Sequence, residues 1–156
     1  MAYLDVITLA DAKNYLRVDD TLTEDDGRIT SMIKACLGIV ERRTNVLVYA
    51  RSKSYDFQNG CVYVYDYPIN TLITPTDAEV QKKGLYSIYT ANVDNGTDLV
   101  LNVGYSDPAE VPAELVEIAL NLLKYFYYEA ETNKANYEEL PIWLQIALDQ
   151  QRRFII

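Results

Sequence analysis

The longest regular pattern of apolar and polar positions runs through residues 112–131, where apolar side chains recur every three or four residues. This spacing predicts an α-helix, and Pro112 suits its first helical position because proline lacks the amide hydrogen that this position leaves unused. The apolar side chains form two neighbouring rows, one of Leu115, Ala119, Leu122 and Phe126 and one of Val116, Leu120, Leu123 and Tyr127. The polar side chains fall on one narrow stripe, made of Glu114, Glu117, Asn121, Lys124 and Glu131. We therefore expect a helix that is covered on most sides, by its own domain or by a neighbouring copy.

Two shorter helices are predicted before this one. The first follows Thr8, which acts as its N-cap, with Asp11 three residues later in the arrangement of a capping box. The second covers residues 24–43, and Asn45 can take the left-handed conformation that ends it. Its apolar face consists of Ile29, Ile33, Cys36 and Val40. Together these helices form an N-terminal helical half, residues 1–45.

A fourth helix is predicted near the C-terminus, where Pro141 opens it. One of its faces consists of Trp143, Ile146, Ala147 and Gln150. The sequence then ends with a basic pair and an apolar tail, made of Arg152, Arg153, Phe154, Ile155 and Ile156. Exposed apolar tails favour association, so this tail is expected either to fold back onto its own core or to dock into a partner.

Between residues 46 and 104 the pattern becomes that of short strands. Five segments are rich in β-branched and aromatic residues, namely 47–49, 61–65, 70–74, 85–90 and 99–103. The Asp94-Asn95-Gly96 turn signal predicts a hairpin between the last two. The expected fold is therefore α+β and mainly helical, with four helices in two halves (1–45 and 105–156) flanking an inserted small antiparallel β-sheet (46–104) in a single domain of residues 1–156.

Charge and composition narrow the function classes. The net charge of −9 argues against a general nucleic-acid binder, which needs a cationic surface, although an acidic wall could let DNA slide past it. The chain has no histidine, which removes the commonest general base and most zinc sites, so no cofactor and no metal site is expected. Cys36 and Cys61 have neither metal-site nor redox spacing and are interpreted as small core residues. No apolar run is long enough to span a membrane, and no signal peptide is expected.

The acidic connector of residues 19–26 has some of the composition of a calcium-binding loop. Counting back from Gly27, the alternate positions are Leu22, Glu24 and Asp26, so the first ligand of such a loop is missing. The alternative is an acidic first turn, with Thr21 or Thr23 capping the second helix.

Two blocks of the sequence and one step between them resemble the head–tail connector family of tailed bacteriophages, also called adaptor or head-completion proteins. The first block is VITLADAKNYLRVD, residues 6–19, and continues through the second helix to the Glu41-x-x-Thr44 pattern near its end. The step is Tyr67-Pro68-Ile69. The second block comprises Gly104, Tyr105, Val111, Pro112, Leu115, Ile118, Ala119, Leu122, Leu123, Tyr128 and Glu129.

This resemblance implies a structural virion protein rather than an enzyme. Members form a ring, often dodecameric, under the portal protein, where it extends the DNA channel and offers a platform to the stopper or tail-completion protein. The implied location is the head–tail junction of the virion, after synthesis in the host cytoplasm, and genomic DNA would pass without sequence-specific binding.

The interface residues are hypotheses at this stage. The tail Arg152, Arg153, Phe154, Ile155 and Ile156 is the candidate for docking to the portal. The candidates for the interface between subunits are Arg42, Arg43, Glu117 and Lys124. For the two arginines, a simple interaction with the helix dipole is an open alternative. Tyr63, Tyr65 and Tyr67 alternate along one strand and suit either a partner contact or a half-buried sheet.

Three other functions remain open from the sequence. The first is a tail-completion or stopper protein of the same particle, although such proteins are more often mainly β. The second is a hydrolase that uses two carboxylates. Among 23 acidic residues some pair will always lie close together, but catalysis needs a cleft in which the pKa of one carboxyl group is raised. The third is an adaptor of the host with no role in a virion.

Overall fold

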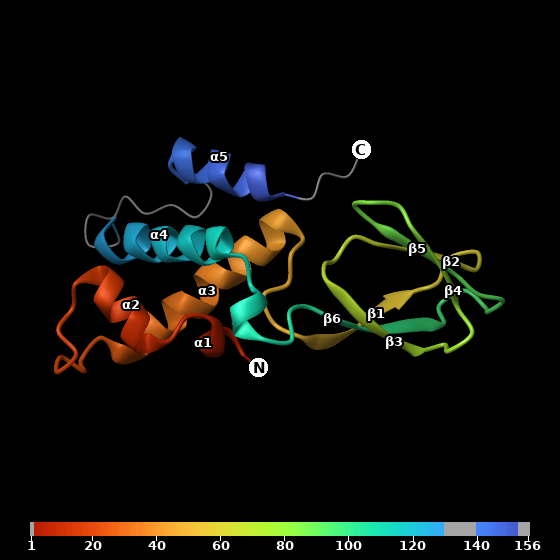
Figure 1. Cartoon of the computed structure of the whole chain (residues 1–156), viewed down its shortest axis with the longest axis horizontal. Coiled ribbons are helices and arrows are strands. Elements are labelled where there is room, and N and C mark those ends of the chain that lie inside the picture. Colours follow the sequence, from red (N-terminus) through yellow and green to blue (C-terminus); the bar gives the residue numbers. More distant parts are fainter. Residues whose placement is uncertain (1, 130–139, 153–156) are drawn as a thin grey trace.

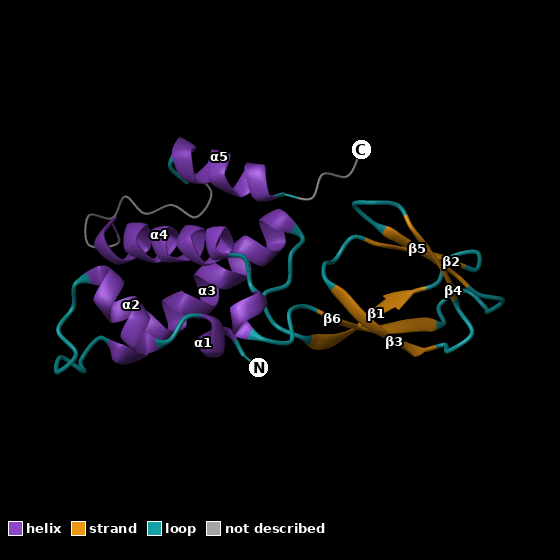
Figure 2. Ribbon diagram, in the orientation of Figure 1, coloured by secondary structure: helices purple, strands orange, loops and turns teal. Residues whose placement is uncertain are grey.

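The computed structural model describes residues 2–129 and 140–152 and has a helical lobe and a β lobe lying side by side (Figure 1). The α+β class predicted from the sequence is confirmed, and helices and strands are fully separated between the two lobes (Figure 2). In the described residues the helices are α1 (Tyr3–Val6), α2 (Leu9–Leu16), α3 (Asp26–Thr44), the 3₁₀ helix η1 (Pro108–Glu110), α4 (Ala113–Glu129) and α5 (Ile142–Gln151). The strands are β1 (Arg51–Asp56), β2 (Cys61–Val64), β3 (Ile69–Thr74), β4 (Glu79–Lys82), β5 (Ser87–Thr90) and β6 (Asp98–Val103).

The centre of the helical lobe is the α3–α4 pair. The first apolar row of α4 is buried as predicted, whereas Val116 and Leu120 of the second row remain partly exposed. The end of α4 meets the start of α3, where the Tyr127 hydroxyl donates to Asp25 Oδ2 at 2.9 Å. Helices α1 and α2 lie on one side of this pair and α5 lies on the other (Figure 1). No helix in the described ranges is both long and apolar enough to cross a bilayer.

Local signals placed α2, the first of the predicted helices, correctly, whereas the short α1 before it was not predicted. Thr8 and Asp11 form the predicted capping box, in which the amide of Asp11 donates to the Thr8 hydroxyl. Asn45 adopts the left-handed conformation with φ 58°, as predicted for the residue after α3.

The predicted cap of the second helix is wrong, because α3 begins after Asp25 and not after a threonine. The reason is the buried side chain of Lys13, which donates to the carbonyl oxygens of Asp20 (3.2 Å) and Leu22 (2.7 Å) and forms an ion pair with Asp26 at 2.7 Å. The Lys13 side chain therefore fixes the path of the acidic connector and the position of Asp26, where α3 begins. No group of three or more histidine, cysteine, aspartate or glutamate side chains in the described segments is arranged to hold a metal ion.

The β lobe differs from the single sheet expected. It contains two three-stranded antiparallel sheets, with strand orders β1-β6-β3 and β2-β5-β4, around a core of their own. Strands β1 and β4 were missed because they are polar and largely exposed. Segment 47–49 is not a strand, although Leu47 and Val48 are buried.

The predicted hairpin between the last two strands is wrong. Strand β5 pairs with β2 and β4, whereas β6 pairs with β1 and β3, so the two lie in different sheets. The turn at Gly96 instead binds the backbone of Phe57, whose side chain is fully buried: Gly96 donates to the Phe57 carbonyl at 3.0 Å, and the Phe57 amide donates to Thr97. The turn signal therefore marks the crossing from one sheet to the other.

The two lobes are joined at Glu41, a carboxylate on α3 that is only 6% exposed. It accepts hydrogen bonds from the Tyr3 hydroxyl (2.6 Å), the Val48 amide (2.9 Å) and both terminal nitrogens of Arg51 (3.0 and 2.8 Å). The Arg51 guanidinium also lies 4.6 Å from the centre of the Tyr49 ring. Burial and the bond to Glu41 raise the pKa of Tyr3 to about 12, and the bond to Glu41 raises the pKa of Arg51. We call these residues (Tyr3, Glu41, Tyr49 and Arg51) the Glu41 junction.

The junction predicts a specific loss of stability. Replacing Arg51→Met leaves the Glu41 carboxylate buried without its cation, and we expect the free energy of unfolding to fall by about 2 kcal/mol, below the usual cost because Arg51 is partly exposed. The control is Lys53→Met, which removes the more exposed ion pair with Asp66 and should cost under about 1 kcal/mol. Chemical denaturation measures both, and equal losses would contradict the role assigned to the junction.

The two cysteines should also differ. Cys36 is buried in the helical core, where desolvation raises the pKa of its thiol to about 12, whereas Cys61 is partly exposed at the start of β2. The interpretation of both as core residues therefore holds fully only for Cys36. We expect one thiol per folded chain to react with a thiol reagent and two after unfolding, because the reactive species is the thiolate. A Cys61→Ser variant should have no reactive thiol when folded, and rapid labelling of it would show that Cys36 is accessible.

Candidate interaction surfaces

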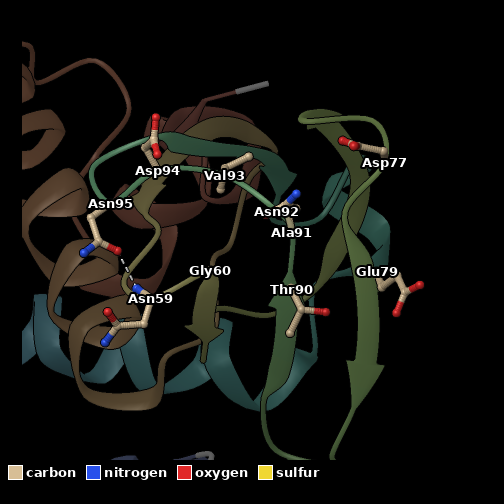
Figure 3. Close-up of a pocket in the computed structure, with 10 residues that line it drawn as sticks. All are labelled: Asn59, Gly60, Asp77, Glu79, Thr90, Ala91, Asn92, Val93, Asp94 and Asn95. Carbon is tan, nitrogen blue, oxygen red and sulfur yellow. Dashed lines mark hydrogen bonds between the residues drawn. The ribbon is translucent and has the colours of Figure 1, made fainter.

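A wide hollow of about 750 Å³ lies in the β lobe, between the turn before β2, the start of β4 and the loop after β5 (Figure 3). Its lining residues are Asn59, Gly60, Asp77, Glu79, Thr90, Ala91, Asn92, Val93, Asp94 and Asn95. Asp94 lies on the opposite side of the hollow from Asp77 and Glu79 in the close-up, so the three carboxylates do not converge on one point. The lining offers amides and carboxylates but no histidine, cysteine or serine, and we find no arrangement there for nucleophilic or acid–base chemistry.

Among residues 2–129 and 140–152, the most exposed group of large apolar side chains lies on α5. Ile142, Trp143 and Ile146 are 74%, 52% and 52% exposed, whereas Leu144 and Leu148 on the other face are buried against the helical core. We call these three exposed residues the α5 ridge. The face predicted from the sequence contained Trp143 and Ile146, and the structure shows that it points mainly to solvent. Clusters of exposed apolar side chains of this kind mark interaction sites.

A groove of about 530 Å³ lies on the other side of the helical lobe. It is lined by Val6, Ile7, Asp11, Asn14, Tyr15, Val116 and Leu120, from α1, α2, α4 and the turn between the first two. We call it the α1–α2–α4 groove. Its wall is fixed by Tyr15, whose hydroxyl lies 3.1 Å from Glu117 Oε1 and 3.0 Å from Asn121 Oδ1. Partial burial and the bond to Glu117 raise the pKa of Tyr15.

The four residues predicted for a subunit interface are all exposed, and no ion pair joins them to one another in the described part of the chain. Arg42 and Arg43 occupy the last turn of α3 and, with Ile39 and Leu140, border a small hollow beside the start of α5. Glu117 stands beside the α1–α2–α4 groove, bonded to Tyr15, and Lys124 lies two turns further along α4.

The predicted docking tail is described only at its first residue. Arg152 is exposed and ends α5, where its amide donates to the Asp149 carbonyl at 3.2 Å. Arg153, Phe154, Ile155 and Ile156 lie outside the described residues.

The tyrosines of the β lobe are divided between two settings. Tyr63 and Tyr65 both lie against Tyr86, and their ring centres are 6.1 and 5.6 Å, respectively, from the ring centre of Tyr86. Tyr67 lies beyond the end of β2 and contacts Tyr105 at 6.4 Å, so it does not continue the same strand face. Tyr63 remains 54% exposed, so the contact between this tyrosine and a partner stays a prediction.

Sequence reasoning missed the Glu41 junction and the exposure of Ile142. Glu41 did carry a signal, because it follows Val40 on the buried side of α3 and is three residues before Thr44 in a pattern already singled out. A carboxylate in such a place requires a partner. That this partner is Arg51 depends on the path of the chain after α3, which the sequence pattern does not show.

Comparison with known proteins gives a likeness of fold and no relative by sequence. No family model matches the chain, and no curated protein does. One chain from the neck of an empty GTA particle computed with C6 symmetry matches with a TM-score of 0.76 and 11% identity, over 100% of this chain and 94% of the other. A chain from the virion of a native gene transfer agent (GTA) particle matches with a TM-score of 0.73 and 12% identity, over 97% of this chain and 91% of the other. A chain from the neck of a native GTA particle computed with C12 symmetry matches with a TM-score of 0.70 and 12% identity, over 100% of this chain and 94% of the other. At this identity the comparison shows that the whole chain shares a fold with these proteins.

Proposed function

We propose that this protein is a structural subunit of the neck of a phage-like particle, where copies assemble into a ring between portal and tail. The observation that carries the proposal is the similarity of fold over the entire chain to chains in GTA necks, with a TM-score of 0.76. The match includes both lobes, so it extends well beyond a shared helical hairpin. The sequence resemblance to head–tail connector proteins, found independently of any structure, supports the same role.

In this role the ring extends the DNA channel and offers a docking surface to the stopper or tail-completion protein. The net charge of −9 suits a channel wall that repels DNA and lets it slide. Twelve copies are the number we propose, and it is compatible with both the C12 and the C6 symmetry with which the necks that contain matching chains were computed. The protein would be made in the host cytoplasm and then reside at the head–tail junction, with residues 152–156 docking to the portal.

Two other functions are less well supported. A stopper or tail-completion protein would be located in the same neck, but the large helical lobe favours the connector, since those proteins are more often mainly β. A hydrolase that uses two carboxylates needs a cleft that buries one acid and raises its pKa, whereas Asp77, Glu79 and Asp94, which line the wide hollow of Figure 3, are all exposed. We therefore propose that the protein has no catalytic role.

Assembly tests the proposal directly. We expect the native mass of the purified protein, alone or mixed with the portal protein of the same particle, to correspond to a closed ring. The measurement is native mass spectrometry over a range of protein concentrations. A protein that remains a monomer at all concentrations and does not bind the portal would contradict the proposed function.

The docking role of the tail has its own test. Deleting residues 153–156 should weaken portal binding at least about tenfold, because a buried apolar anchor is usually worth more than 1.4 kcal/mol. Two full-length variants separate the contributions, Arg152→Glu/Arg153→Glu for charge and Phe154→Ser/Ile155→Ser for apolar contact. Undiminished portal binding by the shortened chain would show that the portal is bound elsewhere.

A further inference from the structure

We propose that the α5 ridge of one copy docks into the α1–α2–α4 groove of the next copy, and that this contact closes the ring. The inference rests on the proposed function, since it names the subunit contact of that ring.

The ridge has the properties of an interface anchor. Its three side chains lie within five residues of one helix, on the face opposite Leu144 and Leu148. Because the buried face already holds α5 against the core, the exposed face is free to bind another surface without rearranging the helix. Trp143 is the residue type most often found at the energetic centre of an interface.

The groove offers the matching surface. Val116 and Leu120 are one turn apart on α4 and remain partly exposed together with Val6. They belong to the apolar second row of α4, which its own lobe covers only in part. The sequence pattern required a cover for this row, from the same domain or from a neighbouring copy, and the α5 ridge of a second copy supplies one.

The two surfaces lie on opposite sides of the α3–α4 pair, with α5 above it and α1 and α2 below it in Figure 2. A contact between different surfaces of identical subunits is head-to-tail, and it leaves one free ridge and one free groove until a ring closes. The arrangement therefore favours a ring over a symmetric dimer.

Charges at the two surfaces are complementary. Arg42 and Arg43 border the hollow at Leu140, two residues before the ridge begins, and they are exposed. Asp11 lines the groove and Glu117 stands beside it, and both are exposed as well. Exposed ion pairs contribute little affinity but set partner and register, so we assign affinity to the ridge and orientation to these charges.

A second copy is the occupant that the structure favours, because one chain carries both halves of the contact. The portal is the alternative occupant of the ridge, and the experiments separate the two.

The first experiment uses Trp143, the only tryptophan of the chain, as a reporter. When the ring assembles, its fluorescence should shift to shorter wavelength and its quenching by acrylamide should decrease severalfold. A ring with unchanged tryptophan fluorescence would overturn the inference while leaving the proposed function intact. A fluorescence change that requires the portal and occurs without contact between subunits would assign the ridge to the portal and also overturn it.

The second experiment measures assembly of variants. Trp143→Ala should raise the protein concentration needed for assembly about 30-fold, the effect of a typical anchor residue. Val80→Ala is the control, because Val80 is also an exposed apolar residue, at 46%, but lies on β4 in the β lobe, and this variant should assemble normally. Equal behaviour of the two variants would contradict the inference.

The third experiment reverses charges. Neither Arg42→Glu/Arg43→Glu nor Glu117→Lys should assemble well alone, because each places like charges across the contact. A 1:1 mixture should assemble into rings in which the two variants alternate, since every contact then joins opposite charges. Lys82→Glu/Lys83→Glu on the β lobe is the control for net charge and should assemble alone. Rings formed by each reversed variant on its own would exclude this contact, whereas failure of the unaltered protein to form any ring would instead reject the proposed function.

Discussion

The arrangement of the two lobes depends on the burial of one carboxylate. Glu41 cannot be desolvated without cations and donors around it, and it obtains them from three separate parts of the chain: α1 through Tyr3, the crossing segment through Val48, and β1 through Arg51. Each of these contacts fixes where the chain leaves the helical lobe. The β lobe is therefore positioned by an ion pair rather than by a large apolar contact between the lobes.

The return crossing is fixed by a steric constraint at the same place. Gly104 has φ 106°, and a Cβ atom there would lie 2.1 Å from the carbonyl oxygen of Tyr49. Only glycine permits two crossing segments to approach so closely. Since the outgoing and returning segments touch at this point, the junction and Gly104 together hold the β lobe in one orientation. In the proposed ring such rigidity would be needed, because an error in orientation would accumulate from one subunit to the next.

The motifs that resemble connector proteins have structural roles in this chain. Thr8 and Asp11 cap α2, Lys13 holds the acidic connector, and Glu41 forms the junction. Thr44 ends α3 by accepting from the Val46 amide and donating to the Val40 carbonyl. These residues specify how the chain folds rather than a chemical site. That is consistent with a fold shared at 11% identity, in which function depends on the surfaces that the fold carries, such as the α5 ridge.

The sequence by itself determined the class of fold, the approximate positions of α2, α3, α4 and α5, and the buried row of α4. Those features follow from caps and from periodicity, which act over a few residues and can be read along the chain. The tertiary structure alone decided that β5 and β6 belong to different sheets, that Arg51 is the partner of Glu41, and that Trp143 points to solvent. These depend on which distant segments meet. The Gly96 turn, for example, has the composition of a hairpin, but its backbone bonds to that of Phe57, directly after β1, and so continues the pairing of β1 with β6. A local pattern shows that a side chain needs a partner, and only the packing of the whole chain determines which partner it finds.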